Sequence, residues 1–386
     1  MTHPPWPVAK LDEPHPLPAR AEVLILGASL AGLSCAYLLA EAGVKVVVVE
    51  PSASLGQCAV GRSAGLANLG LCEHPAQLVE AIGEDDAQAL LELSAHSLRL
   101  LNDHVDWFSK GEIACASMDR EDQAIVRSAG FLTAMGIENR LIENELLWTD
   151  LGCNLFEMGR THPLGGSLNP RLLLQSLAQK AEDAGAHLQL GFASLGLSRV
   201  GSALLLQGAQ GQCRAELVVF ANGWRGSRMD SWFEEKVFPV RAQHCWMPGR
   251  SSLKKAGRTQ HGYLAWGPTP DGVVVSGCRW GSPHMEVGET GDVLNPKISE
   301  HLSEFVRQFS EESSGNLVEW TSIMDFSCDG IPLLGPLPGQ ARKIACVGFG
   351  GQDLGLALGC AEAVVEGILQ GRSALIPKRF HASRLL

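Results

Sequence analysis

The chain has 386 residues, of which 45% are hydrophobic and 43 are glycine, so it is long enough for two domains or for one large domain with an inserted lobe. Its formal charge of −11, from 42 acidic and 31 basic residues, provides no broad basic surface and disfavours a nucleic-acid partner. Eleven scattered cysteines include no Cys-x-x-Cys pair, which indicates neither a disulfide framework nor a zinc knuckle and favours reduced thiols in a cytoplasmic protein.

The first 20 residues are rich in proline and are expected to form an extended leader. They contain no apolar run followed by a small-residue cleavage site, so they do not resemble a signal peptide. Residues 23–49 are apolar, but glycines, Glu41 and Lys45 interrupt them. A buried strand, helix and strand explain this segment better than a transmembrane segment does.

Residues 23–50 form the clearest motif of the chain. The run Val23–Leu26 predicts a strand, an apolar helical face follows it, and Val46–Val49 predicts a second, parallel strand. Gly27 allows a sharp turn and Gly32 allows close packing of the helix, as in dinucleotide-binding βαβ units, although Ser29 occupies the position of the usual second glycine. A serine there narrows the site but can itself bind a phosphate oxygen.

Glu50 follows the second strand, where a carboxylate can bind both ribose hydroxyls of an adenosine. The same carboxylate would repel a 2′-phosphate, which makes NADP the least favoured ligand. The alternative to a nucleotide-binding site is an ordinary tight turn with a surface glutamate.

The remaining elements alternate between helical and α/β character. Residues 80–147 are expected to be helical, with residues 85–108 as the clearest amphipathic helix. A helix beginning at Pro170, a strand at Leu217–Phe220, antiparallel strands over residues 238–275 and a helix at residues 298–309 follow. A strand at Ile344–Val347, a glycine turn and a last helix complete the pattern.

Several separated stretches together resemble the D-amino-acid oxidase (DAO) family of FAD-dependent oxidoreductases. They are the βαβ unit, "GQCAVGRSAGLANLG" after it, "FANGW" in mid-chain, and "CDGIPLLGPLPG" leading to "CVGFGGQDLGLALG". The similarity is greatest to γ-glutamylputrescine oxidase-like and to glycine or sarcosine oxidase-like members. It implies a two-lobed α/β (α+β) fold, in which a Rossmann-like FAD-binding domain carries a discontinuous substrate domain with an antiparallel sheet.

This resemblance implies a division of the chain. The FAD-binding domain is expected at residues 21–80, 148–230 and 325–386, and the substrate domain at residues 81–147 and 231–324. The residues that the resemblance and the first turn place around FAD are Gly27, Ser29, Leu30, Gly32, Glu50, Pro51, Arg62, Ser63, Ala64, Gly65, Leu66, Leu195, Ala221, Gly223, Gly330, Gly348, Gly350, Gly351, Gln352 and Leu354.

The chain departs from the family pattern at three places. Ser29 replaces a glycine, Val60 stands where relatives often have serine, and Gln352 and Asp353 stand where many have histidine and glycine. The last two departures lie near the expected position of the flavin ring and put the usual substrate in doubt.

The resemblance implies hydride transfer from the carbon that bears an amine to the flavin, followed by hydrolysis of the imine. This chemistry depends mainly on positioning and electrostatics, so residues that orient a substrate are sought rather than a catalytic triad. Arg279 is a candidate for binding a substrate carboxylate, although it could equally be a surface arginine or one that neutralises a nearby acid.

Three further groups are candidates. His244 and Tyr263 are expected on strands that face the flavin, although each alone is more often a structural residue. Asp353 is expected to bind a substrate ammonium or to serve at the start of a helix. Trp246, Trp266 and Trp280 form either an apolar wall over the ring or ordinary core packing.

Several alternatives stay open at this stage. An aromatic hydroxylase shares the first turn but needs a Gly-Asp motif that "GFGGQDLG" does not supply. A flavoprotein-fold subunit without amine oxidation, serving electron transfer or assembly, is the main alternative to an oxidase or dehydrogenase. The expected partners are a small amine or amino acid and oxygen or another electron acceptor. Neither Cys58 nor Cys328 decides whether the flavin is covalently attached.

Overall fold

The computed structural model describes residues 3–7, 16–309 and 316–385. The chain divides into two compact units, each assembled from separate segments. The first contains residues 1–6, 62–169 and 241–323, and the second contains residues 7–61, 170–240 and 324–386. Residues 62–80 and 148–169 therefore group with the first unit, whereas the expected division assigned them to the nucleotide-binding domain.

The second unit is built on a parallel sheet. Its elements are β1 (Arg20–Leu26), α1 (Leu30–Glu41), β2 (Val46–Val49), α6 (Pro170–Asp183), β7 (His187–Gln189), β8 (Ser194–Val200), β9 (Ala203–Gly208), β10 (Gly211–Phe220), β16 (Leu333–Leu337), β17 (Gln340–Val347) and α8 (Asp353–Gln370). The strand order is β16-β17-β10-β1-β2-β7, and β17, β10, β1, β2 and β7 run parallel. The predicted parallel pairing of residues 23–26 with residues 46–49 is confirmed.

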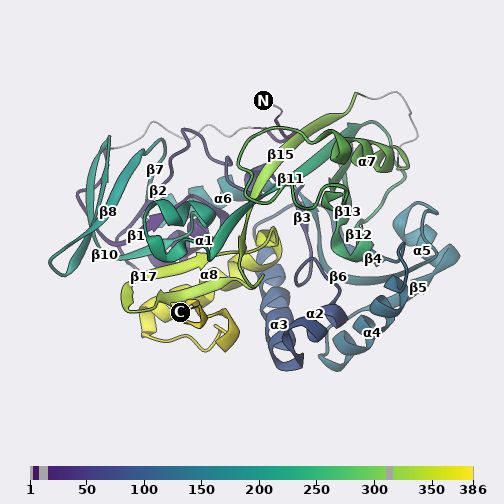
Figure 1. Cartoon of the computed structure of the whole chain (residues 1–386), viewed down its shortest axis with the longest axis horizontal. Helices are drawn as coiled ribbons and strands as arrows, with labels where there is room; N and C mark the ends of the chain where they lie inside the picture. Colours follow the sequence, from purple (N-terminus) through teal and green to yellow (C-terminus); the bar gives the residue numbers. More distant parts are fainter. Residues whose placement is uncertain (1–2, 8–15, 310–315, 386) are drawn as a thin grey trace. The chain divides into compact units, whose positions relative to one another are not determined.

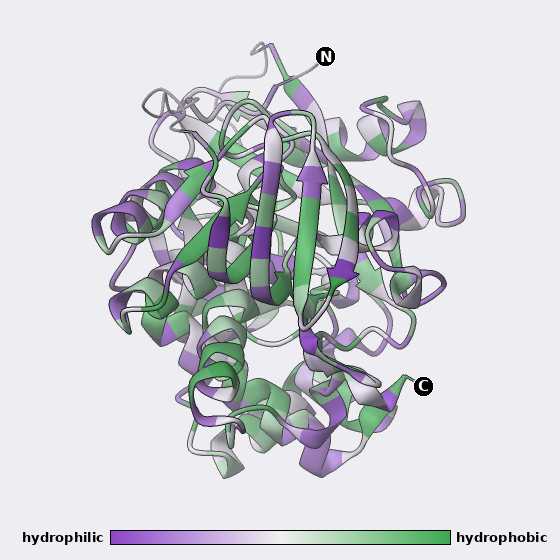
Figure 2. Ribbon diagram, turned by 90° about the vertical axis from the view of Figure 1, so that its left-hand side faces the viewer, coloured by the Kyte–Doolittle hydropathy of each residue, from purple (hydrophilic) through white to green (hydrophobic). Residues whose placement is uncertain are grey.

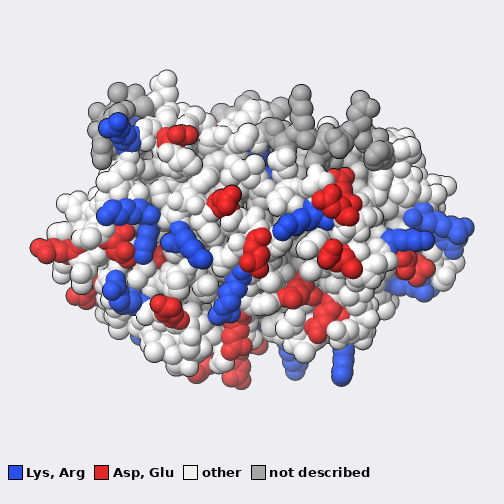
Figure 3. Space-filling view, turned by 180° about the vertical axis from the view of Figure 1, so that it is seen from behind, with Lys and Arg blue, Asp and Glu red and all other residues white. Residues whose placement is uncertain are grey.

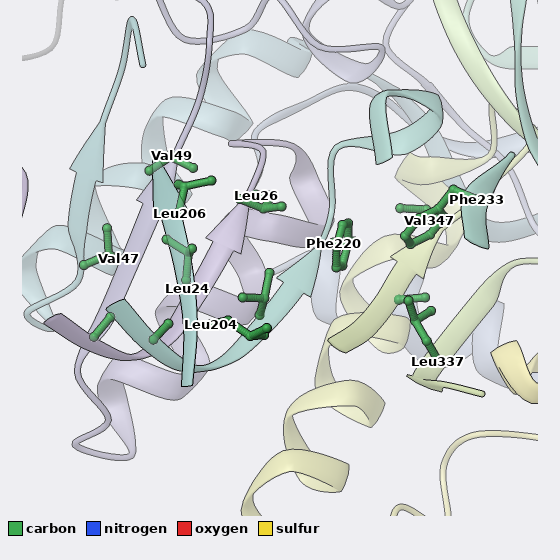
Figure 4. Packing of buried hydrophobic residues seen from close by; sticks show 14 of the residues in the cluster. Leu24, Leu26, Val47, Val49, Leu204, Leu206, Phe220, Phe233, Leu337 and Val347 are labelled. Carbon is green, nitrogen blue, oxygen red and sulfur yellow. The ribbon is translucent and has the colours of Figure 1, made fainter. Parts of the chain in front are cut away.

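Both faces of this sheet are covered, which explains why its strands are continuously apolar. Helix α1 packs against α8, and the Cys35 thiol lies 3.9 Å from the carbonyl oxygen of Ala361 (Figure 1). The opposite face packs under β9 and the turn at Phe233. Figure 4 shows Leu24, Leu26, Val47 and Val49 in contact with this layer, together with Leu204, Leu206 and Phe220.

Strands β8, β9 and β10 form an antiparallel layer beside the parallel strands. The strands nearest the viewer in Figure 2 carry both hydrophilic and hydrophobic stretches. Basic and acidic side chains are interspersed on the face shown in Figure 3.

The first unit is organised around a mixed sheet with the order β15-β11-β14-β13-β12-β4-β6-β3. Its elements are β3 (Leu66–Ala67), α2 (Pro75–Ile82), α3 (Glu84–Leu101), β4 (Trp107–Cys115), α4 (Glu121–Ala134), β5 (Arg140–Glu143), α5 (Asn144–Leu151), β6 (Met158–Leu168), β12 (Ala256–Thr259), β13 (Leu264–Thr269), β14 (Gly272–Gly277) and α7 (Pro296–Arg307), with β11 (Val237–Pro248) and β15 (Val318–Ser327) each spanning a unit boundary.

Two predictions about secondary structure need correction. The helix expected over residues 85–108 ends at Leu101, because Asn102 starts a turn and accepts a hydrogen bond from Trp107 Nε1 at 2.9 Å, and β4 follows. Residues 80–147 also contain β4 and β5 and are not wholly helical. The antiparallel strands expected over residues 238–275 are confirmed by the pairing of β11 with β14 and of β13 with β12 and β14, and β12 also pairs with β4 in parallel.

The leader is only partly within the described residues, since residues 1–2 and 8–15 lie outside them. Within it, Trp6 is buried, donates a hydrogen bond from Nε1 to the Ser63 carbonyl at 3.0 Å and lies near Phe108. This part of the leader is therefore packed against the first unit.

Candidate functional site

Four turns of the second unit lie at one edge of the parallel sheet. They follow β2, β1, β10 and β17, which are consecutive neighbours in the sheet. They carry Glu50, the Gly27 to Gly32 turn, Ala221 to Gly223, and Gly348 to Gly351 respectively. In parallel α/β sheets, ligands bind at the carboxyl ends of the strands. The sheet thus brings together residues that the sequence places far apart.

The turn after β1 is too crowded for a larger residue than glycine at two positions. Gly27 has φ +104°, and a Cβ there would lie 2.8 Å from the carbonyl oxygen of Ala221. A Cβ on Gly32 would lie 2.1 Å from the carbonyl oxygen of Gly27. The turns after β1 and β10 are thus in direct backbone contact, and the Ala221 amide donates to the Leu26 carbonyl at 2.9 Å.

Ser29 has a defined structural role in place of the missing glycine. It is the N-cap of α1, and its Oγ accepts a hydrogen bond from the Gly32 amide at 3.1 Å. The hydroxyl keeps its proton to donate to a phosphate oxygen. Leu30 is buried beneath the first turn of α1, and the first helical amides have no intrahelical partners.

Glu50 lies beside this turn, as its position after β2 predicts. Its Oε2 accepts from the Ala28 amide at 3.1 Å and its Oε1 accepts from the Ser52 amide at 3.0 Å. Each oxygen has a further lone pair for a hydroxyl. Pro51, the next residue, is exposed.

The turn after β17 is lined by two carboxylates. The glycines Gly348, Gly350 and Gly351 all have positive φ, and a Cβ on Gly351 would lie 2.4 Å from Met324 Sδ. Asp325 binds this turn twice, because its Oδ2 accepts from the Gly348 amide and its carbonyl accepts from the Gly350 amide at 2.8 Å. Asp353 begins α8 directly after the turn.

The two carboxylates resist ionisation. Burial, reinforced by the charge of Asp325, raises the pKa of Asp353 to about 8. Burial also raises the pKa of Asp325, against the effect of the Gly348 amide. Asp325 was not among the predicted site residues, because its only signal in the sequence is a carboxylate shortly before "CDG".

The neighbouring groups fit a flavin dinucleotide. Asn222, between Ala221 and Gly223, has a buried Oδ1 without a hydrogen-bond partner among the described residues. Gly223 lies against Asp325, since a Cβ there would be 3.0 Å from the Asp325 Cγ. This buried acceptor and the crowded turns suit a polar ligand that approaches the backbone closely.

Four further residues expected to contact the cofactor also belong to the second unit. Leu195 is 75% exposed in β8, three residues after Phe192, whose amide donates to the Glu50 carbonyl at 2.9 Å. Gly330 has φ +77° in the turn between β15 and β16, and its amide donates to the Ser327 carbonyl at 3.1 Å. Gln352 is the N-cap of α8, and Leu354 is buried in its first turn. Their contacts with a cofactor stay predictions.

The "GRSAGL" segment belongs to the first unit and is firmly held there. Arg62 donates from Nε to the Thr321 carbonyl at 2.9 Å and forms an ion pair with Asp292 at 3.0 Å. Ser63 Oγ accepts from the Gly65 amide at 3.1 Å. Ala64 and Leu66 pack with Trp320, whose Nε1 donates to the Arg62 carbonyl at 2.7 Å. Asp292 therefore offsets the charge of Arg62.

His244 is a buried imidazole held between two hydroxyls. Its Nδ1 lies 2.9 Å from Ser276 Oγ and its Nε2 lies 2.8 Å from Ser322 Oγ, and the ring lies 5.3 Å from that of Trp320. Burial, and secondarily the charge of Arg62, lowers the pKa of His244 to about 3. His244 is therefore neutral at pH 7.

The other candidate residues differ from the expectation in their local structure. Tyr263 is 49% exposed and precedes β13 rather than lying on a strand. Arg279 is half-buried and begins the short helix η5 (Arg279–Gly281), two residues after β14 ends, because Cys278 adopts a left-handed conformation. The Cys278 amide donates to the Tyr263 carbonyl at 2.8 Å, so the two segments are neighbours. Asp353 belongs to the second unit.

The three tryptophans considered for an apolar wall lie in different environments. Trp266 is fully buried and stacks on Phe156 at 5.2 Å in the core of the first unit. Trp280 is 44% exposed and donates to Gln260, whereas Trp246 packs in a separate cluster with Trp320. The three indoles thus serve different environments, and the alternative of ordinary core packing fits Trp266.

The environment of Cys58 bears on whether the flavin is covalently attached through a cysteine. Burial raises the pKa of the Cys58 thiol to about 12, which keeps it protonated and poorly nucleophilic. Cys328 is exposed.

A family comparison identifies the cofactor of this chain. Residues 22–367 match the model of the family described as DAO, FAD dependent oxidoreductase. The chain belongs to this family. It is accordingly an FAD-dependent oxidoreductase, and the mixed α/β fold expected from the sequence is confirmed.

Relatives of known or inferred activity agree with this assignment. The chain is 30% identical over 176 residues to the probable oxidoreductase OrdL of Haemophilus influenzae, covering 44% of this chain and 41% of that protein. It is 25% identical to the tRNA 5-methylaminomethyl-2-thiouridine biosynthesis bifunctional protein MnmC of Polaromonas naphthalenivorans, covering 99% of this chain and 63% of that protein. The chain thus spans between about two fifths and just under two thirds of the length of these relatives.

Solved structures of two other enzymes share the fold. Glycine oxidase from Geobacillus kaustophilus superposes with a TM-score of 0.76 at 19% identity, covering 95% of this chain and 99% of that one. L-proline dehydrogenase from P. horikoshii gives a TM-score of 0.79 at 17% identity, with coverages of 95% and 98%. No helix among the described residues is long and apolar enough to span a bilayer.

Proposed function

We propose that this protein oxidises the C–N bond of a small amine or amino acid. FAD, when bound, accepts the hydride from the carbon that bears the nitrogen. The nitrogen loses a proton, the product is an imine, and water converts the imine into a carbonyl compound and an amine. Oxygen or another acceptor then reoxidises the flavin. The observation that supports this proposal most is the family membership of a chain whose four carboxyl-end turns suit a flavin dinucleotide.

The edge of the parallel sheet is proposed to hold the cofactor. Ser29 and the first amides of α1 would bind the diphosphate, and Glu50 would bind the ribose hydroxyls. The glycine turn from Gly348 to Gly351 opens α8, whose positive end favours negative charge on the flavin ring.

The first unit is proposed to orient the substrate. His244 remains neutral through the physiological range, so the His244–Ser276–Ser322 group would offer hydrogen bonds rather than charge. Arg279 would bind a carboxylate in a bidentate pair. Arg62, engaged with Asp292, is better suited to hold the loop than to bind a substrate.

The nature of the substrate can be tested through Arg279. The purified protein is mixed anaerobically with amino acids, N-methyl amino acids and polyamines, and bleaching of the flavin bands is recorded. If Arg279 binds a carboxylate, Arg279→Ala raises KM at least tenfold for carboxylate-bearing substrates and leaves KM for polyamines unchanged. An equal effect on both classes would refute this role.

The same experiment tests the function itself. Bleaching by one substrate class supports amine oxidation, and the rate of recolouring in air distinguishes an oxidase from a dehydrogenase. A yellow protein that no substrate of the panel bleaches would support the alternative of a flavoprotein subunit without its own amine oxidation.

A further inference from the structure

Three metal-ligating side chains converge in the first unit. His74 precedes α2 as its N-cap, Glu121 is the first residue of α4, and His261 lies in the short helix η4 (Gln260–Gly262). One ligand atom from each lies within 4.8 Å of the other two. The His74 and His261 rings are 5.7 Å apart, edge to face.

The spacing between His74 and Glu121 suits a shared cation. His74 Nε2 lies 3.1 Å from Glu121 Oε1. Two ligands at about 2.0–2.2 Å from a tetrahedral zinc ion are separated by roughly 3.3 Å, so the two atoms need only move apart slightly.

The carboxylate is already oriented by an outer shell. Its Oε2 accepts from the Ser117 amide at 2.8 Å and from the Met118 amide at 3.1 Å. Its Oε1 faces His74 and accepts from the His261 backbone amide at 2.6 Å, which holds the η4 turn against the carboxylate. Gln77 holds the ring of His261, with its Nε2 3.0 Å from Nδ1. Such second-shell contacts fix ligands in place for a metal.

A cavity of about 1040 Å³ lies beside one of the three ligands. It is lined by His261 and by four carboxylates, from Glu80, Asp119, Asp122 and Glu143, together with Arg120 and Arg127. The cavity gives water and cations access to His261, and its acidic residues outnumber its basic ones, whereas the side chains of His74 and Glu121 are fully buried behind it.

We propose that His74, Glu121 and His261 bind a divalent cation of the zinc type, with the fourth position open to the cavity. Two imidazoles and one carboxylate are a ligand set for borderline metals such as Zn²⁺, whereas Ca²⁺ and Mg²⁺ prefer oxygen ligands. Because the ligands come from three separate elements, the ion would join α2, α4 and the η4 turn and stabilise this part of the first unit.

The test is metal stoichiometry, which does not depend on the oxidation reaction. Tag-free, FAD-loaded protein is stripped with a chelator and dialysed against Zn²⁺ or Co²⁺, and the bound metal per chain is measured with the ligand-field spectrum of Co²⁺. We expect one tightly bound ion per chain and a rise in the thermal unfolding temperature with Zn²⁺. Co²⁺ on cysteine thiolates would instead show intense near-ultraviolet charge-transfer bands.

Matched variants locate the ion. His261→Asn is chosen because His261 has φ +52°, a conformation that asparagine tolerates, and Glu121→Gln keeps the side-chain size. Each should weaken Zn²⁺ binding at least tenfold, whereas His284→Asn, at an exposed histidine of the same unit, should leave it unchanged. Absence of a tightly bound ion in the parent protein, or equal binding by the His261 and His284 variants, would overturn the proposal.

Discussion

Asp353→Asn should make the protein more stable than the parent, and increasingly so as the pH rises. Burial and Asp325 raise the pKa of Asp353 to about 8, from a reference value of 3.8. Between these two pH values the unfolded chain has released the proton and the folded chain keeps it. Each pH unit in that window therefore removes about 1.4 kcal/mol from the free energy of unfolding. Asparagine does not titrate in this range, so the variant does not lose this free energy of unfolding.

The sign of the pH dependence is thus fixed. Titration of Asp353 should contribute little to the difference in the free energy of unfolding near pH 4. Above that pH the stability advantage of the variant should grow, and it should reach a plateau above pH 8. The difference in the free energy of unfolding between the two proteins should be several kcal/mol at most, because the site can relax and the titration of Asp353 is coupled to that of Asp325. Urea unfolding of both proteins at half-unit steps from pH 5 to pH 9, with saturating FAD, measures the difference.

Asp329→Asn is the matched control, because the pKa of the Asp329 carboxylate is shifted in the opposite direction. Burial would raise the pKa of Asp329, but the hydrogen bond and charge of Arg384 lower it. This variant should be less stable than the parent at neutral pH and approach it as the pH falls below about 4. A pH-independent loss of stability in Asp353→Asn would show that Asp353 is ionised in the folded protein and would refute the reasoning.

The remaining predictions concern the cofactor edge and the buried histidine. Ser29→Ala removes the N-cap hydroxyl that accepts from the Gly32 amide, so it should lower the free energy of unfolding by about 1 kcal/mol. It should also weaken FAD binding, which titration of the apoprotein measures. The control is Ser34→Ala in the same helix, which should lower stability without changing FAD affinity, since the Ser34 Oγ donates to the Leu30 carbonyl. Gly32→Ala should abolish the yellow colour of the purified protein, because its Cβ would lie 2.1 Å from a backbone oxygen; retention of FAD at parental affinity would contradict the crowded-turn interpretation. His244→Asn leaves one buried serine hydroxyl without its partner and should cost about 1–3 kcal/mol in urea unfolding, while the parent should show no inflection in its pH–rate profile from His244 between pH 5 and pH 8, since its pKa is about 3.

The sequence by itself determined the parts of the structure that depend on short-range patterns. Continuous valine and leucine runs identified β1 and β2 as parallel strands, because only a strand covered on both faces is apolar throughout. Gly27 and Gly32 were recognisable since their backbone geometry excludes a side chain. Glu50 was found because its distance along the chain from the turn fixes its place at the end of β2. Family membership followed from the order of such motifs.

The tertiary structure alone decided which distant groups meet and how their environments change their chemistry. Asp325 and Asp353 are ordinary carboxylates in the sequence, and only their common burial beside one turn raises their pKa values. Trp266 and Trp280 are close in the sequence, yet one is in the core and the other is exposed. His74, Glu121 and His261 meet only because α2, α4 and the η4 turn pack together. Burial and long-range contact are properties of the folded chain, so no local pattern of residues contains them.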